Sequence, residues 1–409
     1  MWNDLTRSLQ HRNYRHYLLG QLVSLNGTQM ASVAQAWLVY HMTQSSMMLG
    51  MVHFSMLVPV LLFALFSGVL ADRFPRRRLL LFSQGSAMLL SFLLALLALG
   101  GWIELWHIFV IAFLIGTTQA IDMPVRQAFL AELVPKQMLS NAVGLNSGVF
   151  NTARFLGPAI AGLLLLQWEP GYLFALNGMS YLLLLYILWM MRIEASTHTP
   201  RAREGKRTAL TNGLRYVWGH QEIRPALFHV GVVSMMGTAF VVLMPVFADQ
   251  HYQGGSDTLG WLLAAAGAGS LIGALNLARK RSGVPLAPVI CSSGVVGAIA
   301  LALFAFSEWL PLSLLILFVA GFSITTVVAS TNAYIQQLVE DQMRGRLMAV
   351  FSMIFVGMAP FGSLTAGVLA EWQGIQFAVL LFSLLGVTAS LYFMVGLFRN
   401  RKNGVESEA

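Results

Sequence analysis

Two arginines and one aspartate stand inside long apolar stretches of this chain. Asp122 and Arg126 are four residues apart, so they share one face of a helix, with the acid first, which is the favourable order for a helical ion pair. If the chain reverses direction near residue 137, two antiparallel helices place Arg154 and Asp122 at similar depths in the membrane. The two depths would differ by roughly 3 Å, because each residue adds about 1.5 Å along a helix. Because a lone charge in hydrocarbon costs several kcal/mol, we expect the three side chains to form a buried charge network.

Three roles stay open for this network. Asp122 is the only carboxylate deep within a predicted membrane span, which makes it the candidate for a protonatable coupling group, with Arg154 as an anchor for an anionic or polar substrate. In a second interpretation the charges are structural and lock two helices together. In a third they contact substrate directly. Two nearby arginines favour the ionised carboxylate, which opposes protonation while the pair is closed.

The elements that must position these residues are membrane-spanning helices. Of 409 residues, 57% are hydrophobic and only 10% are charged, against roughly 25% charged in an ordinary soluble domain. A spanning helix needs about 20 predominantly apolar residues. The sequence supplies twelve such stretches, near residues 13–42, 47–71, 79–100, 104–133, 139–167, 171–191, 225–249, 256–278, 284–306, 311–338, 344–370 and 374–397.

The basic residues give this chain a direction across the membrane. All of the 25 Lys and Arg residues except Arg126 and Arg154 fall on one side of the predicted spans, and such residues accumulate in cytoplasmic loops. We therefore expect a multi-pass protein with both termini in the cytoplasm. The same pattern accounts for the net charge of +8, so we expect membrane lipids as partners of the basic residues and no nucleic acid.

The second half of the chain repeats the first. A shift of 205 residues places Gly116 on Gly321 and Gly157 on Gly362. We expect an all-α membrane protein of twelve transmembrane helices, arranged as two pseudo-symmetric six-helix bundles around a central cavity, the architecture of parallel-repeat transporters that work by alternating access. The predicted parts are an N-terminal bundle (1–192), a cytoplasmic linker with a possible amphipathic helix (193–224), and a C-terminal bundle with a short tail (225–409).

A charged run after the second predicted span indicates a conformational latch. Asp72 could dock at the start of the eleventh span near Arg344, while Arg76 or Arg77 reaches Glu132 at the end of the fourth. These bonds would hold the cytoplasmic side shut. A pure topology signal would explain the arginines but not Asp72. The candidate latch comprises Gly68, Asp72, Arg73, Arg76, Arg77, Glu132 and Arg344.

These motifs resemble those of the major facilitator superfamily over nearly the whole chain. The run from Gly68 to Arg78 is similar to the Gly-x-Leu-x-Asp-Arg-x-x-Arg-Arg loop of that family. The segments 122–129 and 146–154 resemble the bacterial transmembrane secretion effector branch, which includes the enterobactin exporter. A fifth-span motif resembles the glycine-proline pattern of family members that work as antiporters, and it consists of Gly144, Gly157, Pro158 and Gly162.

The resemblance implies that spans one, four, seven and ten, with their neighbours, line the substrate cavity. Polar side chains there could instead join helices to one another, and methionine or phenylalanine could simply pack. The candidate cavity residues are Asn26, Gln29, Gln119, Asn146, Arg154, Met236, Phe240, Thr325, Thr326 and Ser330.

Together these features predict a secondary active transporter and not an enzyme. The expected activity is proton-coupled export of a small amphipathic or siderophore-like compound across the bacterial inner membrane. Siderophore or nutrient import and polyspecific drug efflux are alternatives, and a non-transporting membrane receptor is the alternative from a different class. We expect a monomer whose partners are a small-molecule substrate, protons and lipids. No cofactor or metal site is expected, and the single Cys291 excludes an intrachain disulfide.

Overall fold

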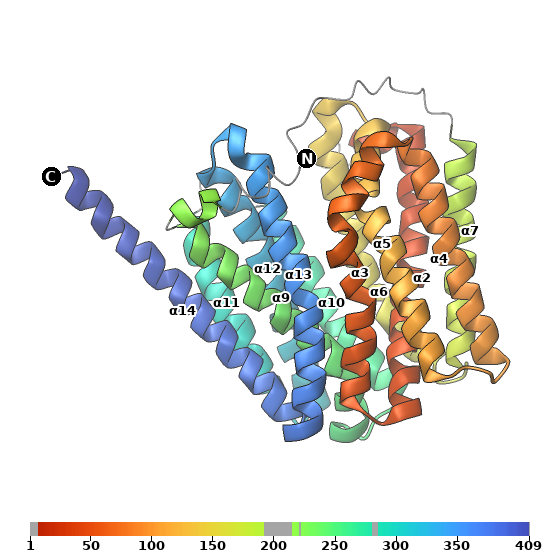
Figure 1. Cartoon of the computed structure of the whole chain (residues 1–409). Coiled ribbons are helices and arrows are strands. Elements are labelled where there is room, and N and C mark those ends of the chain that lie inside the picture. The colour runs from red at the N-terminus through yellow and green to blue at the C-terminus, as the bar shows by residue number, and fades with distance from the viewer. Residues whose placement is uncertain (1–6, 192–214, 221, 280–284, 409) are drawn as a thin grey trace. The chain divides into compact units, whose positions relative to one another are not determined.

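The computed structural model of the chain describes residues 7–191, 215–220, 222–279 and 285–408. This part of the chain holds twelve long α-helices (Figure 1), which confirms the predicted all-α fold. The first six are α2 (Arg12–Thr43), α3 (Ser46–Arg73), α4 (Arg76–Leu99), α5 (Leu105–Leu133), α6 (Leu139–Leu164) and α7 (Pro170–Met190). The second six are α9 (Ile223–Val246), α10 (Ser256–Arg279), α11 (Leu286–Phe304), α12 (Leu310–Leu338), α13 (Asp341–Gln373) and α14 (Ile375–Glu408).

Several connections between these helices show why the chain turns where it does. Between α2 and α3, Gln44 adopts the left-handed conformation and the Ser45 side chain accepts a hydrogen bond from the Met48 backbone N–H, which caps α3. Gly374, at φ 91°, ends α13 where a side chain would be strained. A π-helical turn, η3 (Phe247–His251), extends α9. The chain therefore reverses direction at residues suited to it by backbone freedom or capping groups.

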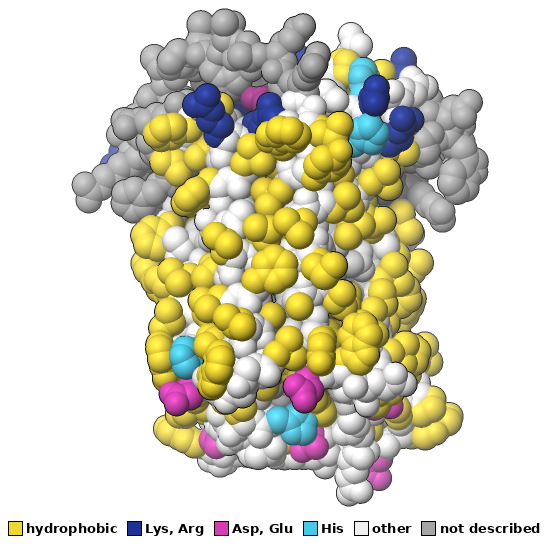
Figure 2. Space-filling model, turned by 90° about the vertical axis from the view of Figure 1, so that its right-hand side faces the viewer, with side chains coloured by type: hydrophobic (Ala, Val, Ile, Leu, Met, Phe, Trp, Pro, Cys, Tyr) yellow, Lys and Arg dark blue, Asp and Glu magenta, His cyan; other side chains and the backbone are white. Residues whose placement is uncertain are grey.

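Ten of the described helices are long and apolar enough to cross a membrane by length and composition. The other two long helices, α2 and α6, carry more polar side chains. One face of the molecule shows a hydrophobic band, with Lys and Arg gathered at one end and most Asp and Glu at the other (Figure 2). This distribution is the one that a membrane protein with basic cytoplasmic loops would have.

The chain divides into two compact units. The first unit comprises Met1–Met48, Ser55–Arg201 and Ala248–Ala264, and the second comprises Leu49–Phe54, Ala202–Phe247 and Ala265–Ala409. Each sequence half thus contributes one short segment to the unit formed mainly by the other half. The predicted boundaries at residues 192 and 224 stay a prediction. Most of the predicted amphipathic linker helix lies outside the described residues, although residues 215–219 are helical.

The two units repeat one packing scheme. In the first unit α2 packs on α6 and α7, while α4 packs on α5 and α7. In the second unit α9 packs on α13 and α14, while α11 packs on α12 and α14. The bounds of α5 and α12 are 205 residues apart at both ends, as the sequence repeat requires. Sequence repeat and structural repeat therefore coincide.

Glycines at matching positions permit the closest helix contacts. A Cβ added to Gly116 on α5 would overlap the carbonyl oxygen of Met56 on α3, and a Cβ added to Gly321 on α12 would overlap the carbonyl oxygen of Ala266 on α10. In a membrane the hydrophobic effect does not drive helices together, so van der Waals contact between closely approaching backbones carries much of the packing energy. The repeat preserves this contact in both units.

We predict that Gly116→Ala and Gly321→Ala each lower the thermal unfolding temperature of the purified protein. Each methyl group would force two backbones apart, which costs about 1–3 kcal/mol as overpacking. Tryptophan fluorescence during heating in detergent measures the effect. Gly144→Ala on α6 is the control, because open space surrounds that glycine. An equal or higher unfolding temperature for both packing variants would contradict this account of the helix contacts.

Candidate functional site

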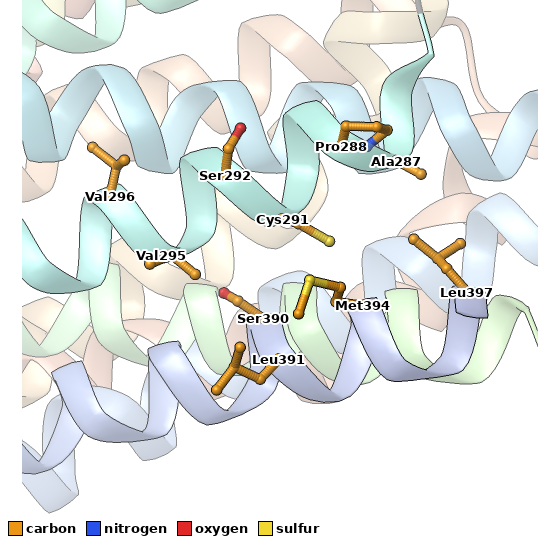
Figure 3. A pocket seen from close by; sticks show the side chains of 10 residues that line it. All are labelled: Ala287, Pro288, Cys291, Ser292, Val295, Val296, Ser390, Leu391, Met394 and Leu397. Carbon is orange, nitrogen blue, oxygen red and sulfur yellow. The ribbon is translucent and has the colours of Figure 1, made fainter. Parts of the chain in front are cut away.

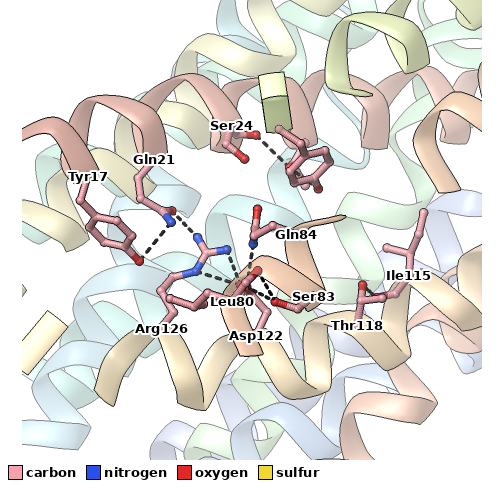
Figure 4. A network of polar contacts seen from close by, with 12 residues as sticks. Tyr17, Gln21, Ser24, Leu80, Ser83, Gln84, Ile115, Thr118, Asp122 and Arg126 are labelled. Carbon is pink, nitrogen blue, oxygen red and sulfur yellow. Dashed lines mark hydrogen bonds and ion pairs between the residues drawn. The ribbon is translucent and has the colours of Figure 1, made fainter. Parts of the chain in front are cut away.

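Asp122 is a buried carboxylate within the length of α5. Its Oδ1 accepts hydrogen bonds from Ser83 Oγ at 3.0 Å and from Gln84 Nε2 at 2.6 Å, both on α4. Because α4 and α5 are packed together, these two donors reach the carboxylate from a neighbouring helix. The carboxylate is therefore fixed in place by side chains as well as by its own helix (Figure 4).

Arg126 joins Asp122 to a third helix. Its Nε lies 2.9 Å from Asp122 Oδ2, and its Nη2 forms an ion pair with the same oxygen. Its Nη1 donates to the side-chain oxygen of Gln21 on α2, and Gln21 in turn donates to the hydroxyl of Tyr17 at 3.1 Å. The buried Tyr17 ring packs edge-on to Phe129 with the ring centroids 5.4 Å apart. The cluster thus connects α2, α4 and α5.

This cluster, which we call the Asp122 cluster, consists of Tyr17, Gln21, Ser83, Gln84, Asp122 and Arg126. One negative and one positive charge leave it neutral, which lowers the cost of holding both in a water-poor site. Gln84 Oε1 is buried and has no hydrogen-bond partner among the described residues. Two helices besides α5 therefore hold the ion pair in place through hydrogen-bonding side chains.

Arg154 does not join the Asp122 cluster, which corrects the expected three-residue network. It is exposed, and among the described residues it makes no hydrogen bond or ion pair. The reason is the packing of α6, which lies mainly along α2 and only slightly against α5. Equal depth along two consecutive helices does not place their side chains together when those helices pack on other neighbours.

The predicted contact between the start of α4 and the end of α5 is present. Arg76 Nη1 lies 2.9 Å from a carboxylate oxygen of Glu132 and 2.9 Å from the carbonyl oxygen of Ala128. Arg77 donates to the carbonyl oxygens of Leu188, at 2.7 Å, and Trp189. These bonds tie three helices of the first unit together at one end. They do not by themselves test the predicted latch.

The other members of the predicted latch are described less fully. Gly68, Asp72 and Arg73 belong to α3, but their surroundings lie outside the described part of the structure. Arg344 is exposed in the first turn of α13. The docking of Asp72 near Arg344 therefore stays a prediction.

The fifth-span motif provides two close helix contacts. A Cβ at Gly157 would lie 2.5 Å from Gln29 Cβ on α2, and a Cβ at Gly162 would lie 2.6 Å from Gly260 Cα on α10. The carbonyl oxygen of Pro158 lies beside Gly260 as well. Gly144 has open space around it and belongs to no such contact. Three of the four motif residues therefore lie at helix-packing positions.

The candidate cavity residues fall into three groups, of which the exposed Arg154 forms one. Five are half-buried, as expected of a wall that solvent can reach: Asn26, Gln29, Gln119, Asn146 and Thr325. Four are buried inside the second unit, which corrects their expected placement at a cavity surface: Met236, Phe240, Thr326 and Ser330. The sulfur of Met236 lies against Gly386 of α14, and Thr326 donates to the carbonyl oxygen of Phe322 at 2.7 Å. Helix number alone does not reveal which face of a helix is packed.

The structure contains a hydrogen bond between Tyr40 and Asp249 that the sequence did not lead us to predict. The buried Tyr40, near the end of α2, donates to Asp249 Oδ2 at 2.9 Å, and both residues belong to the first unit. Asp249 lies in the π-helical turn η3, an irregularity that is frequent at functional sites. The signal that could have found it is a carboxylate close to the end of the predicted span 225–249. No group of described His, Cys, Asp and Glu residues could hold a metal ion.

The second unit packs its equivalent helices together without an ion pair at the corresponding place. At the positions 205 residues after Asp122, Arg126 and Gln21 stand Val327, Thr331 and Ala226. All three are buried, and Val327 and Ala226 belong to the apolar core of that unit. The packing scheme shared by the units therefore does not require an ion pair at this place.

A sequence profile described as "Transmembrane secretion effector" matches residues 6–407 of this chain. The staphyloferrin A transporter of Staphylococcus aureus is 26% identical, with 95% of this chain and 96% of the relative covered. The multidrug efflux pump Tap of Mycolicibacterium fortuitum is also 26% identical, with 91% and 93% covered. Among solved structures, the nucleoside transporter NupG has a TM-score of 0.73 at 12% identity, with 94% of this chain and 99% of that chain covered.

We predict that Arg126→Thr destabilises the protein more than the double substitution Asp122→Val with Arg126→Thr. The single change strands a buried carboxylate, which costs about 3–5 kcal/mol, whereas the double change removes both charges and installs the residues of the second unit. Thermal unfolding in detergent gives the comparison. Arg78→Thr is the control, because Arg78 is an exposed arginine on α4. A double variant less stable than the single one would show that the pair contributes net stability.

Proposed function

The chain belongs to the transmembrane secretion effector family of the major facilitator superfamily, and on that premise we propose that it exports a small amphipathic or siderophore-like compound by proton-coupled alternating access. Members of this superfamily are multi-pass membrane transporters and not enzymes. The bacterial inner membrane is the proposed location, with both termini in the cytoplasm. A monomer with its bundle boundaries near residues 192 and 224 is the proposed form.

The asymmetry of the Asp122 cluster is the observation that carries this proposal. Two units with one packing scheme differ at this place, where the first holds an ion pair and the second holds apolar or hydroxyl side chains. A buried ion pair can often be replaced by packed apolar residues without loss of stability. A charge pair that the packing scheme does not need is better explained by function, and a buried carboxylate that can gain a proton is the chemistry that coupling requires.

In the proposed mechanism the ion pair opens before the proton binds. Protonation of Asp122 would follow movement of Arg126 toward its other partner, Gln21 on α2. Protonated Asp122 no longer attracts Arg126, and the bonds from Ser83 and Gln84 on α4 are weakened as well. Proton binding would therefore loosen the junction of α2, α4 and α5. Two arrangements of this junction would be the two states that the proton selects between.

The exposed Arg154 is the proposed substrate anchor. Its guanidinium has five donors in a fork that matches carboxylates, and no described side chain uses them. Relatives named as a staphyloferrin A transporter and as the macrolide efflux protein A of Streptococcus pyogenes support an amphipathic compound. The half-buried amides of Asn26, Gln29 and Asn146 would supply further hydrogen bonds. The bonds of Arg76 and Arg77 would keep one end of the first unit rigid during the cycle, in support of the latch.

We predict that Asp122→Asn abolishes proton-driven transport while substrate exchange at equal pH continues. The amide keeps the shape of the carboxylate but cannot carry the proton. Uptake into inside-out proteoliposomes, with and without a pH gradient, separates the two activities. Glu104→Gln is the control, since Glu104 is an exposed carboxylate at the start of the same helix. Full gradient-driven uptake by a normally folded Asp122→Asn protein would refute coupling through this residue.

Arg154→Gln should weaken binding of carboxylate-bearing siderophores by about ten- to a hundredfold. Loss of a charge-assisted hydrogen bond to the guanidinium costs roughly 1.5–3 kcal/mol of binding free energy. A thermal-shift titration against siderophores and macrolides measures the change for each class. Arg78→Gln serves as the charge-matched control. Unchanged siderophore binding together with weakened macrolide binding would favour drug efflux, and transport into right-side-out rather than inside-out vesicles would favour import.

A further inference from the structure

A lateral groove lies between α11 and α14 in the second unit. Its cavity has a volume of about 560 Å³, within the range of small-molecule sites (Figure 3). Its walls include Cys291 and Val295 on α11 and Leu391, Met394 and Leu397 on α14. Val296 and Leu391, at its rim, are 46% and 44% exposed, so the groove opens to the outside of the unit. On a chain that spans a membrane, this opening faces hydrocarbon.

The few polar groups in the groove are already satisfied. Ser390 Oγ donates to the carbonyl oxygen of Gly386 at 2.8 Å and lies 2.9 Å from Nε2 of the buried His229. Ser292 Oγ donates to the carbonyl oxygen of Val289 at 3.3 Å. Neither hydroxyl therefore needs a partner from a ligand. A polar solute would lose its water without compensation here, whereas a hydrocarbon chain would lose nothing.

The shape of the groove follows from one close contact. A Cβ at Gly294 on α11 would overlap Ser390 Oγ on α14 and lie 2.7 Å from the His229 ring. The two helices therefore meet closely at Gly294 and Ser390. The lining residues extend from that contact toward Ala287 and Leu397, at the start of α11 and along the last third of α14. The groove is elongated along the helices, as an extended chain would require.

Basic residues follow the groove-lining part of α14 in the sequence. Beyond Leu397 the helix α14 continues through Arg399, Arg401 and Lys402, two to five residues further on. The first turn of α11 begins at the same end, and its N-cap residue Pro285 makes no side-chain capping bond. Basic residues beside a membrane surface attract anionic lipids, and the positive end of a helix adds to that attraction. The other end of the groove has no comparable run of basic residues in the sequence.

We propose that the groove between α11 and α14 binds one acyl chain of an anionic phospholipid, whose headgroup lies at the basic end. The apolar walls, the satisfied hydroxyls and the lateral opening match a hydrocarbon chain. The basic run on α14 selects the negative headgroup. This site is separate from the Asp122 cluster and from the proposed substrate anchor, so its occupant is a resident lipid and not the transported compound.

Native mass spectrometry of the full-length protein tests the proposal. The protein is released from nanodiscs of phosphatidylethanolamine with and without phosphatidylglycerol. We expect one retained phosphatidylglycerol, and at least about tenfold less of it with Val295→Trp, which fills the groove. Ile299→Trp is the matched control, because Ile299 is an exposed residue of α11 that does not line the groove. Retention by the control should equal that of the parent protein.

Two further measurements locate the lipid. Replacing Arg399, Arg401 and Lys402 together by Gln should remove the preference for phosphatidylglycerol over phosphatidylethanolamine. Added phosphatidylglycerol should slow the alkylation of the single Cys291 by a membrane-permeable maleimide in detergent. Equal retention by Val295→Trp and the parent, equal retention of the two lipids by the parent, or alkylation that slows only with siderophores or macrolides would each overturn the proposal. A matching unfolding temperature of the variants shows that folding is intact.

Discussion

A charge inside hydrocarbon must be neutralised or reach water, and this requirement shapes most of the polar structure of the first unit. Asp122 and Arg126 meet it by pairing with each other, while Asp122 accepts a hydrogen bond from Gln84 on α4 and Arg126 donates one to Gln21 on α2. Arg76 meets it at the start of α4 through Glu132, at the end of α5. Arg154, without a partner among the described residues, meets it only if the space beside α6 holds water or a charged ligand. The ion pair and the exposed Arg154 thus answer one physical demand in two ways.

Packing and charge follow different rules in the two units. The glycines at 116 and 321 give both units the same backbone contact, because any side chain there would push helices apart. The charge pair occurs at one of two equivalent places, where Val327 and Thr331 replace Asp122 and Arg126. Shared features therefore report what the fold needs. A feature found in only one unit indicates a role that the other unit does not have.

Periodicity and hydropathy were sufficient to predict the helices, because a bilayer leaves few alternatives to a long apolar helix. The Asp122–Arg126 pair was predictable for a similar reason, since four residues on one helix fix the distance between two side chains. Contacts between helices were harder. The absence of Arg154 from the cluster, the burial of Met236 and Ser330, and the roles of Gln21 and Gln84 all depend on which helices pack together and on their rotation. The spacing of residues along the sequence specifies neither the packing partners nor the rotation of a helix.

A single coupling carboxylate also sets an energetic ceiling. If Asp122 alone carries the proton, the proposed cycle moves one elementary charge inward, which releases about 2.3 kcal/mol for each 100 mV of membrane potential. That energy sustains roughly a fortyfold concentration ratio of a neutral substrate. A second carboxylate at the position of Val327 would double the charge and square the ratio. Under the proposed coupling, the valine in the second unit would therefore limit how steep a gradient the electrical driving force can maintain.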